Sequence, residues 1–233
     1  MGYGAAALIA IVPLLLVLRV ETPNNPHEDH GRGIPAGSRP LVVIGTIFFA
    51  LYVGVEITFA GWIYRYAEAR GFANASGATV FGALFLGAFA VGRIIGVPIA
   101  QRLSAKRMLY LDHALALAAL FILVVGRFSV GALAVGTVLF GIGVASMFAS
   151  MLSLSEAHVA ATGTVTSLYL VGSSVGSMTL PWATGNLLTR FGPNAFPAVA
   201  MGSTLLTFVT VVLFVAVSRS LPLPPGRENR VGC

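Results

Sequence analysis

Apolar stretches long enough to cross a lipid bilayer recur along this whole chain, and they limit the folds open to it. A transmembrane helix needs roughly 20 apolar residues to cross about 30 Å of hydrocarbon. By that criterion we predict seven spans, at 2–20, 41–66, 77–100, 108–125, 129–151, 163–187 and 195–217. Charged residues make up 9% of the 233, against about 25% in a soluble domain. The sequence therefore predicts an all-α, polytopic membrane helix bundle.

Two polar segments separate or end these spans. Residues 21–40, with the sequence ETPNNPHEDHGRGIPAGSRP, are rich in Pro, Gly and charge, which predicts a loop between the first span and the other six. We expect short turns between the spans from 41 to 217, which would form one six-helix bundle. Residues 218–233 have no apolar periodicity and are predicted to be a disordered tail.

The basic residues predict an orientation. The formal net charge of +6 would suit nucleic acid in a soluble protein, but these residues fall between apolar runs, so we predict no nucleic-acid partner. Nine lie on one side: Arg19, Arg32, Arg39, Arg102, Lys106, Arg107, Arg219, Arg227 and Arg230. Four lie on the other: Arg65, Arg70, Arg127 and Arg190. The positive-inside rule then places the C-terminus in the cytoplasm and Met1 outside. A chain that begins outside, directly in a span, resembles the remainder of a longer protein.

Glycines inside the spans indicate how the helices pack. Gly92/Gly96 and Gly172/Gly176 each have the GxxxG spacing, which brings two small residues to one helix face. The spacing fits ordinary close packing in a bundle. It fits equally the weakly bonded, sliding helices that a transporter needs.

Three prolines, Pro98, Pro181 and Pro197, fall within or near span ends. Each removes a backbone hydrogen bond, so each is expected to kink its helix. Trp182, next to Pro181, would either line a cavity beside such a kink or anchor the helix at the membrane interface.

Glu56 is a carboxylate inside the apolar run LYVGVEITFAGWIYRYAE (51–68). At 1.5 Å per residue it lies about 4 Å from the centre of its span, where a charge is costly unless it meets water or a partner. The residues on its helical face are Tyr52, Phe59 and Ile63, and those on nearly the opposite face are Gly54, Thr58 and Gly61. We expect the first face to line a cavity and the second to pack on a neighbour. Aromatic rings beside a carboxylate suit a polyhydroxylated ligand; a protonated Glu56 in a structural hydrogen bond is the alternative.

Arg93 is the other charge inside a span, about 7 Å to the cytoplasmic side of its centre. Roughly 10 Å of depth then separates Arg93 from Glu56, so a direct pair would need both side chains extended. We expect Arg93 to snorkel toward the basic loop QRLSAKR or to hold a cytoplasmic gate.

The remaining signals are weaker. Asp112-His113 opens the fourth span and Glu156-Ala157-His158 is expected in a loop, where either His would be interfacial or relay a proton. Asn74-Ala75-Ser76 is a glycosylation sequon on the predicted outer side. The single cysteine, Cys233, excludes an internal disulfide. Residues 27–30 (His-Glu-Asp-His) have metal-ligating types but lie in a loop without a further cluster, so we predict no metal and no cofactor.

Other seven-span classes lack their signatures here. No D-R-Y follows the third span, no N-P-x-x-Y occurs in the last, and no cysteine pair could form a receptor's outer disulfide. A retinal protein needs a mid-span lysine, but the one lysine, Lys106, falls in a loop. Seven-span sugar carriers carry Pro-Gln motifs, and none occurs. No mid-span histidine partners the Ser-rich span ends, so we predict no enzyme.

Three segments resemble, in order, parts of the C-terminal half of a major facilitator superfamily transporter. LYVGVEITFAGWIYRYAE resembles that fold's seventh helix in the sodium-dependent glucose transporter-like branch, related to fucose permeases. GRIIGVPIAQRLSAKRML resembles its eighth helix and basic eight–nine loop, and LPWATGNLLTRFGP its eleventh helix. The resemblance is spread over residues 41–217. It makes 2–20 equivalent to the sixth helix and 21–40 to the central cytoplasmic loop, in agreement with the orientation from charge.

The resemblance implies a secondary carrier or facilitator of a sugar such as glucose or a related hexose, working by alternating access in what we expect is the plasma membrane. With Tyr52 from the predicted cavity face, the expected substrate-binding residues are Tyr52, Glu56, Trp62, Trp182 and Asn186. Asn186 stands where relatives often have Gln. The expected gating or cytoplasmic-loop residues are Arg93, Arg102 and Arg107.

The first five helices of that fold have no counterpart in this sequence. The expected partners are therefore the sugar, the lipid bilayer, and a missing N-terminal half or another carrier subunit. A non-transporting membrane protein that binds or regulates a full-length carrier is the alternative.

Overall fold

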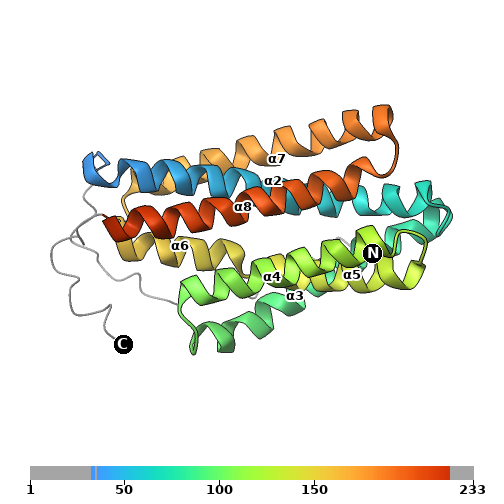
Figure 1. Ribbon diagram of the computed structural model, residues 1–233, viewed down its shortest axis with the longest axis horizontal. Helices are drawn as coiled ribbons and strands as arrows, with labels where there is room; N and C mark the ends of the chain where they lie inside the picture. Colours follow the sequence, from blue (N-terminus) through green and yellow to red (C-terminus); the bar gives the residue numbers. More distant parts are fainter. Residues whose placement is uncertain (1–32, 35, 221–233) are drawn as a thin grey trace, which may run out of the picture. The chain divides into compact units, whose positions relative to one another are not determined.

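The computed structural model describes residues 33–34 and 36–220, which form a bundle of α-helices with no β-strand among them (Figure 1). A short 3-10 helix, η1 (Ala36–Ser38), leads into the bundle. The helices are α2 (Arg39–Ala69), α3 (Ala75–Ala100), α4 (Ala105–Val125), α5 (Val130–Val144), α6 (Met147–His158), α7 (Gly163–Phe191) and α8 (Ala195–Ser220). The short connections at 70–74, 101–104, 126–129, 159–162 and 192–194 agree with the predicted turns. The predicted span at 2–20 lies outside the described residues, as do almost all of the 21–40 loop and the tail beyond 220.

Polar residues fix where four of the helices begin. In each, a side-chain oxygen just before the helix accepts a hydrogen bond from an N–H of the first turn. The pairs are Asn74–Gly77, Ser104–Arg107, Ser129–Ala132 and Thr162–Val165, at 2.9–3.5 Å. Such a cap satisfies an N–H that the first turn leaves unpaired and contributes about 1 kcal/mol.

The fifth predicted span, 129–151, consists of two helices, and its end was predicted wrongly. α5 and α6 are separated at Ala145–Ser146, where the Ala145 N–H bonds to Ile142 O, three residues back. The glycine-rich sequence GIGVAS permits this tighter turn. Glu156-Ala157-His158, predicted to lie in a loop, is the last turn of α6. Backbone hydrogen bonds continue there although the side chains become polar, so the apolar criterion ended the span too early.

Five segments are long and apolar enough to cross a membrane: Arg39–Ala69, Gly77–Ala100, Ala105–Val125, Val130–His158 and Ala195–Ser220. α7 has 29 residues, but its Ser and Thr residues make it more polar than these five. The bundle confirms the predicted polytopic, all-helical class.

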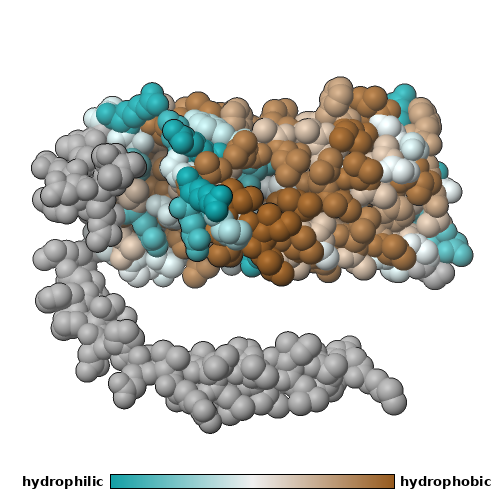
Figure 2. Space-filling view, turned by 90° about the horizontal axis from the view of Figure 1, so that it is seen from below, coloured by the Kyte–Doolittle hydropathy of each residue, from teal (hydrophilic) through white to brown (hydrophobic). Residues whose placement is uncertain are grey.

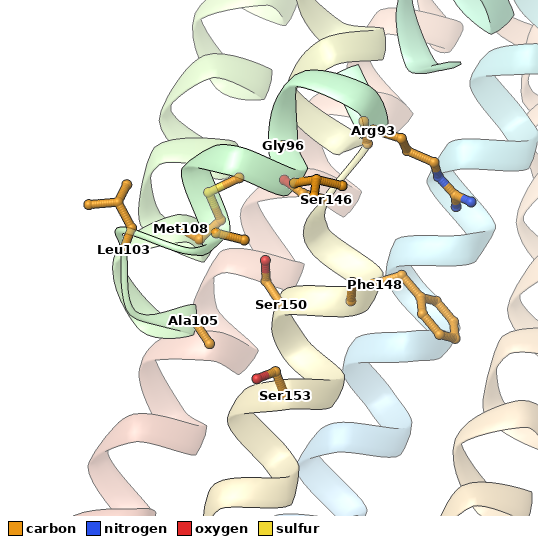
Figure 3. A pocket seen from close by; sticks show the side chains of 13 residues that line it. Arg93, Gly96, Leu103, Ala105, Met108, Ser146, Phe148, Ser150 and Ser153 are labelled. Atoms are coloured by element: carbon orange, nitrogen blue, oxygen red, sulfur yellow. The ribbon is translucent and has the colours of Figure 1, made fainter. Parts of the chain in front are cut away.

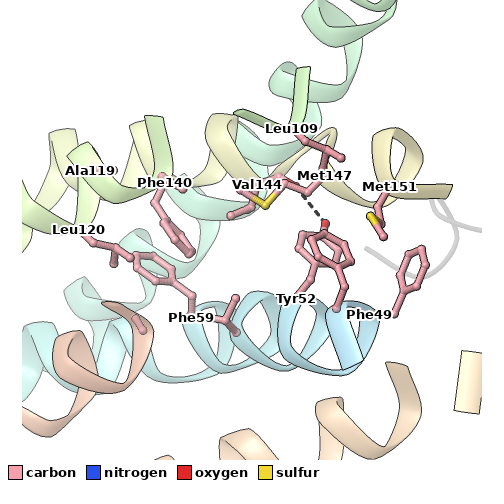
Figure 4. Packing of buried hydrophobic residues seen from close by; sticks show 14 of the residues in the cluster. Phe49, Tyr52, Phe59, Leu109, Ala119, Leu120, Phe140, Val144, Met147 and Met151 are labelled. Carbon is pink, nitrogen blue, oxygen red and sulfur yellow. Dashed lines mark hydrogen bonds between the residues drawn. The ribbon is translucent and has the colours of Figure 1, made fainter. Parts of the chain in front are cut away.

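α2 contacts α3, α6, α7 and α8. The Phe59 ring of α2 packs against three others, on α3 (Phe85, 5.1 Å between centroids), α5 (Phe140, 4.2 Å) and α8 (Phe196, 5.3 Å). Figure 4 shows Phe59 and Phe140 side by side in this core. In lipid such van der Waals contacts, rather than exclusion of water, hold helices together.

The GxxxG pair on α7 lies directly against the backbone of α2. A Cβ built on Gly172 would lie 2.6 Å from the backbone carbonyl oxygen of Thr46, and one on Gly176 only 1.8 Å from the backbone carbonyl oxygen of Ala50. Gly92 on α3 meets the α5–α6 break, since its Cβ would lie 2.8 Å from Ala145 Cβ. Both glycine pairs therefore lie at helix contacts.

Two predictions about helix faces and kinks are wrong. Phe59 and Ile63, expected to line a cavity, are fully buried in the core. On the opposite face Gly54 and Thr58 are buried, as predicted, but Gly61 has nothing within 4 Å. Other helices pack on both sides of α2, so a helical wheel that divides it into one cavity face and one packing face cannot predict which residues are buried. Pro197 is the third residue of α8, where a first-turn N–H has no intrahelical partner to lose, so it cannot kink the helix. α3 and α7 continue as helices through Pro98 and Pro181.

Candidate functional site

Glu56, the carboxylate inside α2, is half-buried. Its carboxyl lies near the Tyr52 hydroxyl, one turn earlier, and within electrostatic range of the Arg93 guanidinium on α3. Within the described residues the one ion pair joins Arg65 to Glu68 (3.1 Å), so Glu56 and Arg93 attract each other without pairing. An acceptor and a donor held apart in this way retain hydrogen-bonding capacity for a polar ligand.

Tyr52 is fully buried and connects α2 to α5. Its hydroxyl donates to the Val144 carbonyl at 2.9 Å, drawn as the dashed line in Figure 4. Its ring stacks on Phe48, with centroids 5.8 Å apart and planes 7° from parallel. The structure thus places Tyr52 beside Glu56 but inside the packed core.

Arg93 is exposed on α3, and its guanidinium carbon lies 4.6 Å from the centroid of the Phe89 ring. Figure 3 shows the side chain extending toward α2, on the same side as the Phe148 ring. Sequence reasoning expected this side chain to reach the basic loop or hold a gate. It lines one cavity together with Phe148 and lies within electrostatic range of Glu56, which brings it into the candidate site.

A cavity of about 540 Å³ adjoins Arg93. Its lining combines apolar residues of α3 and of the α3–α4 turn with Arg93 and three serines of the α5–α6 break and α6, namely Ser146, Ser150 and Ser153. Four- and three-residue steps put these serines on one helical face, as Figure 3 shows. The cavity is thus mostly apolar, with one cation and a row of hydroxyls.

Asp112 and His113 were expected near the start of a span, interfacial or solvated, but both are buried in α4. Ser146 Oγ donates to both Asp112 carboxylate oxygens at 2.8 Å. His113 Nδ1 lies 2.7 Å from Leu109 O, and Nε2 lies 3.2 Å from Thr207 Oγ1 on α8. The four-residue spacing of Met108, Asp112 and Ala116, all buried, was the sequence signal that Asp112 lies on the packed face.

The other predicted binding residues lie on a different part of the bundle from Glu56. The Trp62 indole Nε1–H donates to Pro181 O on α7 at 3.1 Å. Trp182 is 73% exposed, and the Asn186 amide donates back to its carbonyl at 2.9 Å. The structure therefore brings together Tyr52, Glu56 and Arg93. It joins Trp62 to the helix that carries Trp182 and Asn186.

Arg102 lies in the turn between α3 and α4 and Arg107 in the first turn of α4, and both are exposed. The sequence at 27–30 with metal-ligating residue types lies outside the described residues. Across the part of the chain that the structure describes, no group of three His, Cys, Asp or Glu residues could hold a metal ion.

The sides of the bundle carry large exposed apolar side chains, including Val80 (60% exposed), Ile94 (73%) and Phe121 (62%). Figure 2 shows hydrophobic residues over the middle of one face and hydrophilic residues gathered toward one end. Such a surface is costly in water and suited to lipid. With five membrane-length helices, it defines a multi-pass integral membrane protein.

The sequence profile of the Major Facilitator Superfamily matches residues 1–181 of this chain. The chain belongs to that superfamily. It is 29% identical over 192 residues to sodium-dependent glucose transporter 1A of Mus musculus, covering 82% of this chain and 45% of that protein. It is 26% identical over 207 residues to major facilitator superfamily domain-containing protein 4A of Homo sapiens, covering 86% and 40%. The predicted resemblance to the glucose transporter-like branch is confirmed, and the chain spans less than half the length of these relatives.

Proposed function

We propose that this chain supplies the C-terminal half of a membrane transporter that moves a sugar such as glucose or a related hexose by alternating access. The observation that carries the proposal is that Glu56 and Arg93 attract each other without forming an ion pair, while the Phe148 ring lines the same cavity as Arg93. A carboxylate accepts hydroxyl donors, a guanidinium donates to hydroxyl oxygens, and a ring covers the C–H face of a sugar. The name of the mouse relative, a glucose transporter, supports a sugar as the substrate.

In this proposal the binding residues differ in how they act. Glu56 bonds sugar hydroxyls directly, and the buried Tyr52 acts by fixing this part of α2 against α5 through its hydrogen bond to Val144 O. Trp182 and Asn186, which lie on a different part of the bundle from Glu56, contact the sugar at another point of its path across the membrane. Trp62 positions α7 through its hydrogen bond to Pro181 O. The opposite wall comes from an N-terminal half or from another carrier subunit.

The test is uptake of labelled hexose by cells that express the longest protein containing this chain. We expect uptake, and we expect Glu56→Gln to reduce it at least tenfold, the effect of losing about 1.4 kcal/mol of binding. Glu156→Gln, at an exposed carboxylate on α6, is the matched control and should transport normally. Normal uptake by Glu56→Gln would reduce Glu56 to a packing residue.

The same measurement separates the alternative, a membrane protein that binds or regulates a full-length carrier. That alternative predicts no uptake by this protein in cells lacking other sugar carriers. It also predicts copurification with a full-length carrier and a changed rate of uptake by that carrier.

We also propose that the α3–α4 turn with Arg102, the start of α4 with Arg107, and the C-terminus face the cytoplasm of cells that carry the protein in the plasma membrane. Cys233 is the one cysteine of the sequence and therefore a natural reporter. A membrane-impermeant maleimide should label it only after the cells are permeabilised. Labelling of Cys233 in intact cells would show that the C-terminus faces outward, opposite to the proposed orientation.

A further inference from the structure

The break between α5 and α6 is held by polar contacts from two other helices. From α2, Tyr52 donates its hydroxyl hydrogen to Val144 O at 2.9 Å. From α4, Asp112 accepts the Ser146 hydroxyl on both carboxylate oxygens at 2.8 Å. Val144 and Ser146 are only two residues apart, so each contact restrains the angle at which α6 continues from α5.

Asp112 is a carboxyl group with little access to solvent and no paired cation. It is 7% exposed, and within the described residues no Lys, Arg or His forms an ion pair with it. The titratable or charged groups around it are His113 on α4 itself, Tyr52 from α2 and, beyond Ser146, Arg93 from α3. From α8, Thr207 faces His113 rather than Asp112. A buried carboxylate with one hydroxyl partner is costly to keep charged.

A path to water nevertheless exists. Ser146, which bonds Asp112, also lines the cavity of about 540 Å³, together with Ser150 and Ser153. Asp112 is thus one hydroxyl away from an accessible space. A hydroxyl can donate to a carboxylate and can accept from a protonated carboxyl, so Ser146 is a suitable partner in both states.

We propose that Asp112 is a proton-binding site that couples transport to the α5–α6 break, an inference that rests on the proposed transport function. A proton enters through the cavity and binds a carboxylate oxygen of Asp112. The resulting carboxyl O–H donates to Ser146 Oγ, whose own hydrogen turns to another acceptor. The charged two-oxygen contact is replaced by a neutral, weaker one, and α6 gains freedom to move. Release of the proton restores the contact.

The ligands at hand favour a proton over a metal cation. A cation such as Ca²⁺ takes six to eight oxygen ligands, and even Mg²⁺ keeps near-octahedral coordination. At Asp112 the structure supplies one carboxylate and one serine hydroxyl, and that hydroxyl points its hydrogen at the carboxylate. A proton needs only this pair.

The site also lies close to the proposed sugar site. Tyr52 adjoins Glu56 on one side and holds Val144 on the other, and Val144 is two residues from Ser146. Sugar binding at Glu56 and proton binding at Asp112 would therefore act on the same break. This shared contact supplies the coupling that two separate sites require.

The direct test is infrared spectroscopy of the purified chain in lipid as the pH is lowered, following the carbonyl band of a protonated carboxyl. We expect the wild type and the control Glu156→Gln to gain the component of this band that comes from a buried carboxyl, and Asp112→Asn to lack that component. Ser146→Ala removes the hydrogen-bond partner and should shift the band. Ser153→Ala, which changes a serine of the same cavity, should leave it in place.

Two results would overturn the proposal: an undiminished band in Asp112→Asn, or a carboxyl that responds to sodium at constant pH rather than to protons. If Asp112→Asn does not fold, the Ser146→Ala variant tests the proposal instead. An unshifted carboxyl band in that variant would show that the protonated carboxyl is not the one bonded to Ser146, and would overturn the proposal. Uptake is measured separately, and hexose uptake by Asp112→Asn should no longer respond to an imposed proton gradient. Absence of uptake in the wild type would refute the transport function and leave the infrared result standing.

Discussion

Gly176 is the position where the described bundle has least room for a side chain, so Gly176→Ala tests how α7 packs on α2. The added Cβ would lie 1.8 Å from the Ala50 oxygen and 2.8 Å from its Cα, whereas non-bonded atoms settle at about 3.5 Å. Both obstructing atoms belong to the backbone, so no change of rotamer relieves the clash and the helices must move apart. Overpacking of this kind typically costs about 1–3 kcal/mol, and we expect the upper end.

The assay is thermal unfolding of the purified protein in detergent. At about 2–4 °C per kcal/mol for a chain of this size, a loss of about 3 kcal/mol lowers Tm by roughly 6–12 °C. Gly61→Ala is the matched control, because Gly61 lies on α2 with nothing within 4 Å; its Tm should stay the same or rise slightly. Equal Tm values for the two variants would refute close backbone packing between α2 and α7.

Three further predictions concern single contacts. Tyr52→Phe leaves the Val144 carbonyl without its donor and should cost about 1–3 kcal/mol, read as a lower Tm in the same assay. Trp62→Phe removes the indole hydrogen bond to Pro181 and should cost about 1 kcal/mol; an unchanged Tm would show that the ring packing alone anchors α7. Ser104→Ala removes the cap of α4 and should cost about 1 kcal/mol, visible as faster amide exchange in the first turn of that helix.

The positions of the spans could be predicted because bilayer thickness sets a minimum length of apolar sequence. The run at 41–66 corresponds to Arg39–Ala69 and the run at 77–100 to Ala75–Ala100. The predicted and observed bounds differ at the helix ends, because capping hydrogen bonds rather than hydropathy determine where a helix begins and ends. Asn74 begins α3 through its hydrogen bond to Gly77, and no apolar count detects such a bond.

The faces of the helices could be predicted only in part. The spacing of Gly172 and Gly176 predicted a close contact, because small residues on one face have few other uses in a membrane. Whether the helical face of Glu56 lines a cavity depends on the helices packed around α2. That face also carries Phe59, which packs against rings from three helices, and nothing in one segment's sequence states how many helices surround it. The exposure of Arg93 toward α2 likewise depends on the placement of α3.

At the break at 144–146, contacts to several helices are made by only three residues, whereas elsewhere in the bundle such contacts are spread along whole helices. Three consecutive residues meet three different helices: Val144 accepts from Tyr52 of α2, Ala145 packs on Gly92 of α3, and Ser146 donates to Asp112 of α4. α2 and α7, by contrast, are in backbone contact at Gly176, which favours their moving as one unit. A change in the angle between α5 and α6 would alter all three contacts at once without separating that pair. Motion of the bundle is therefore expected to begin at this break rather than at the glycine contacts between α2 and α7.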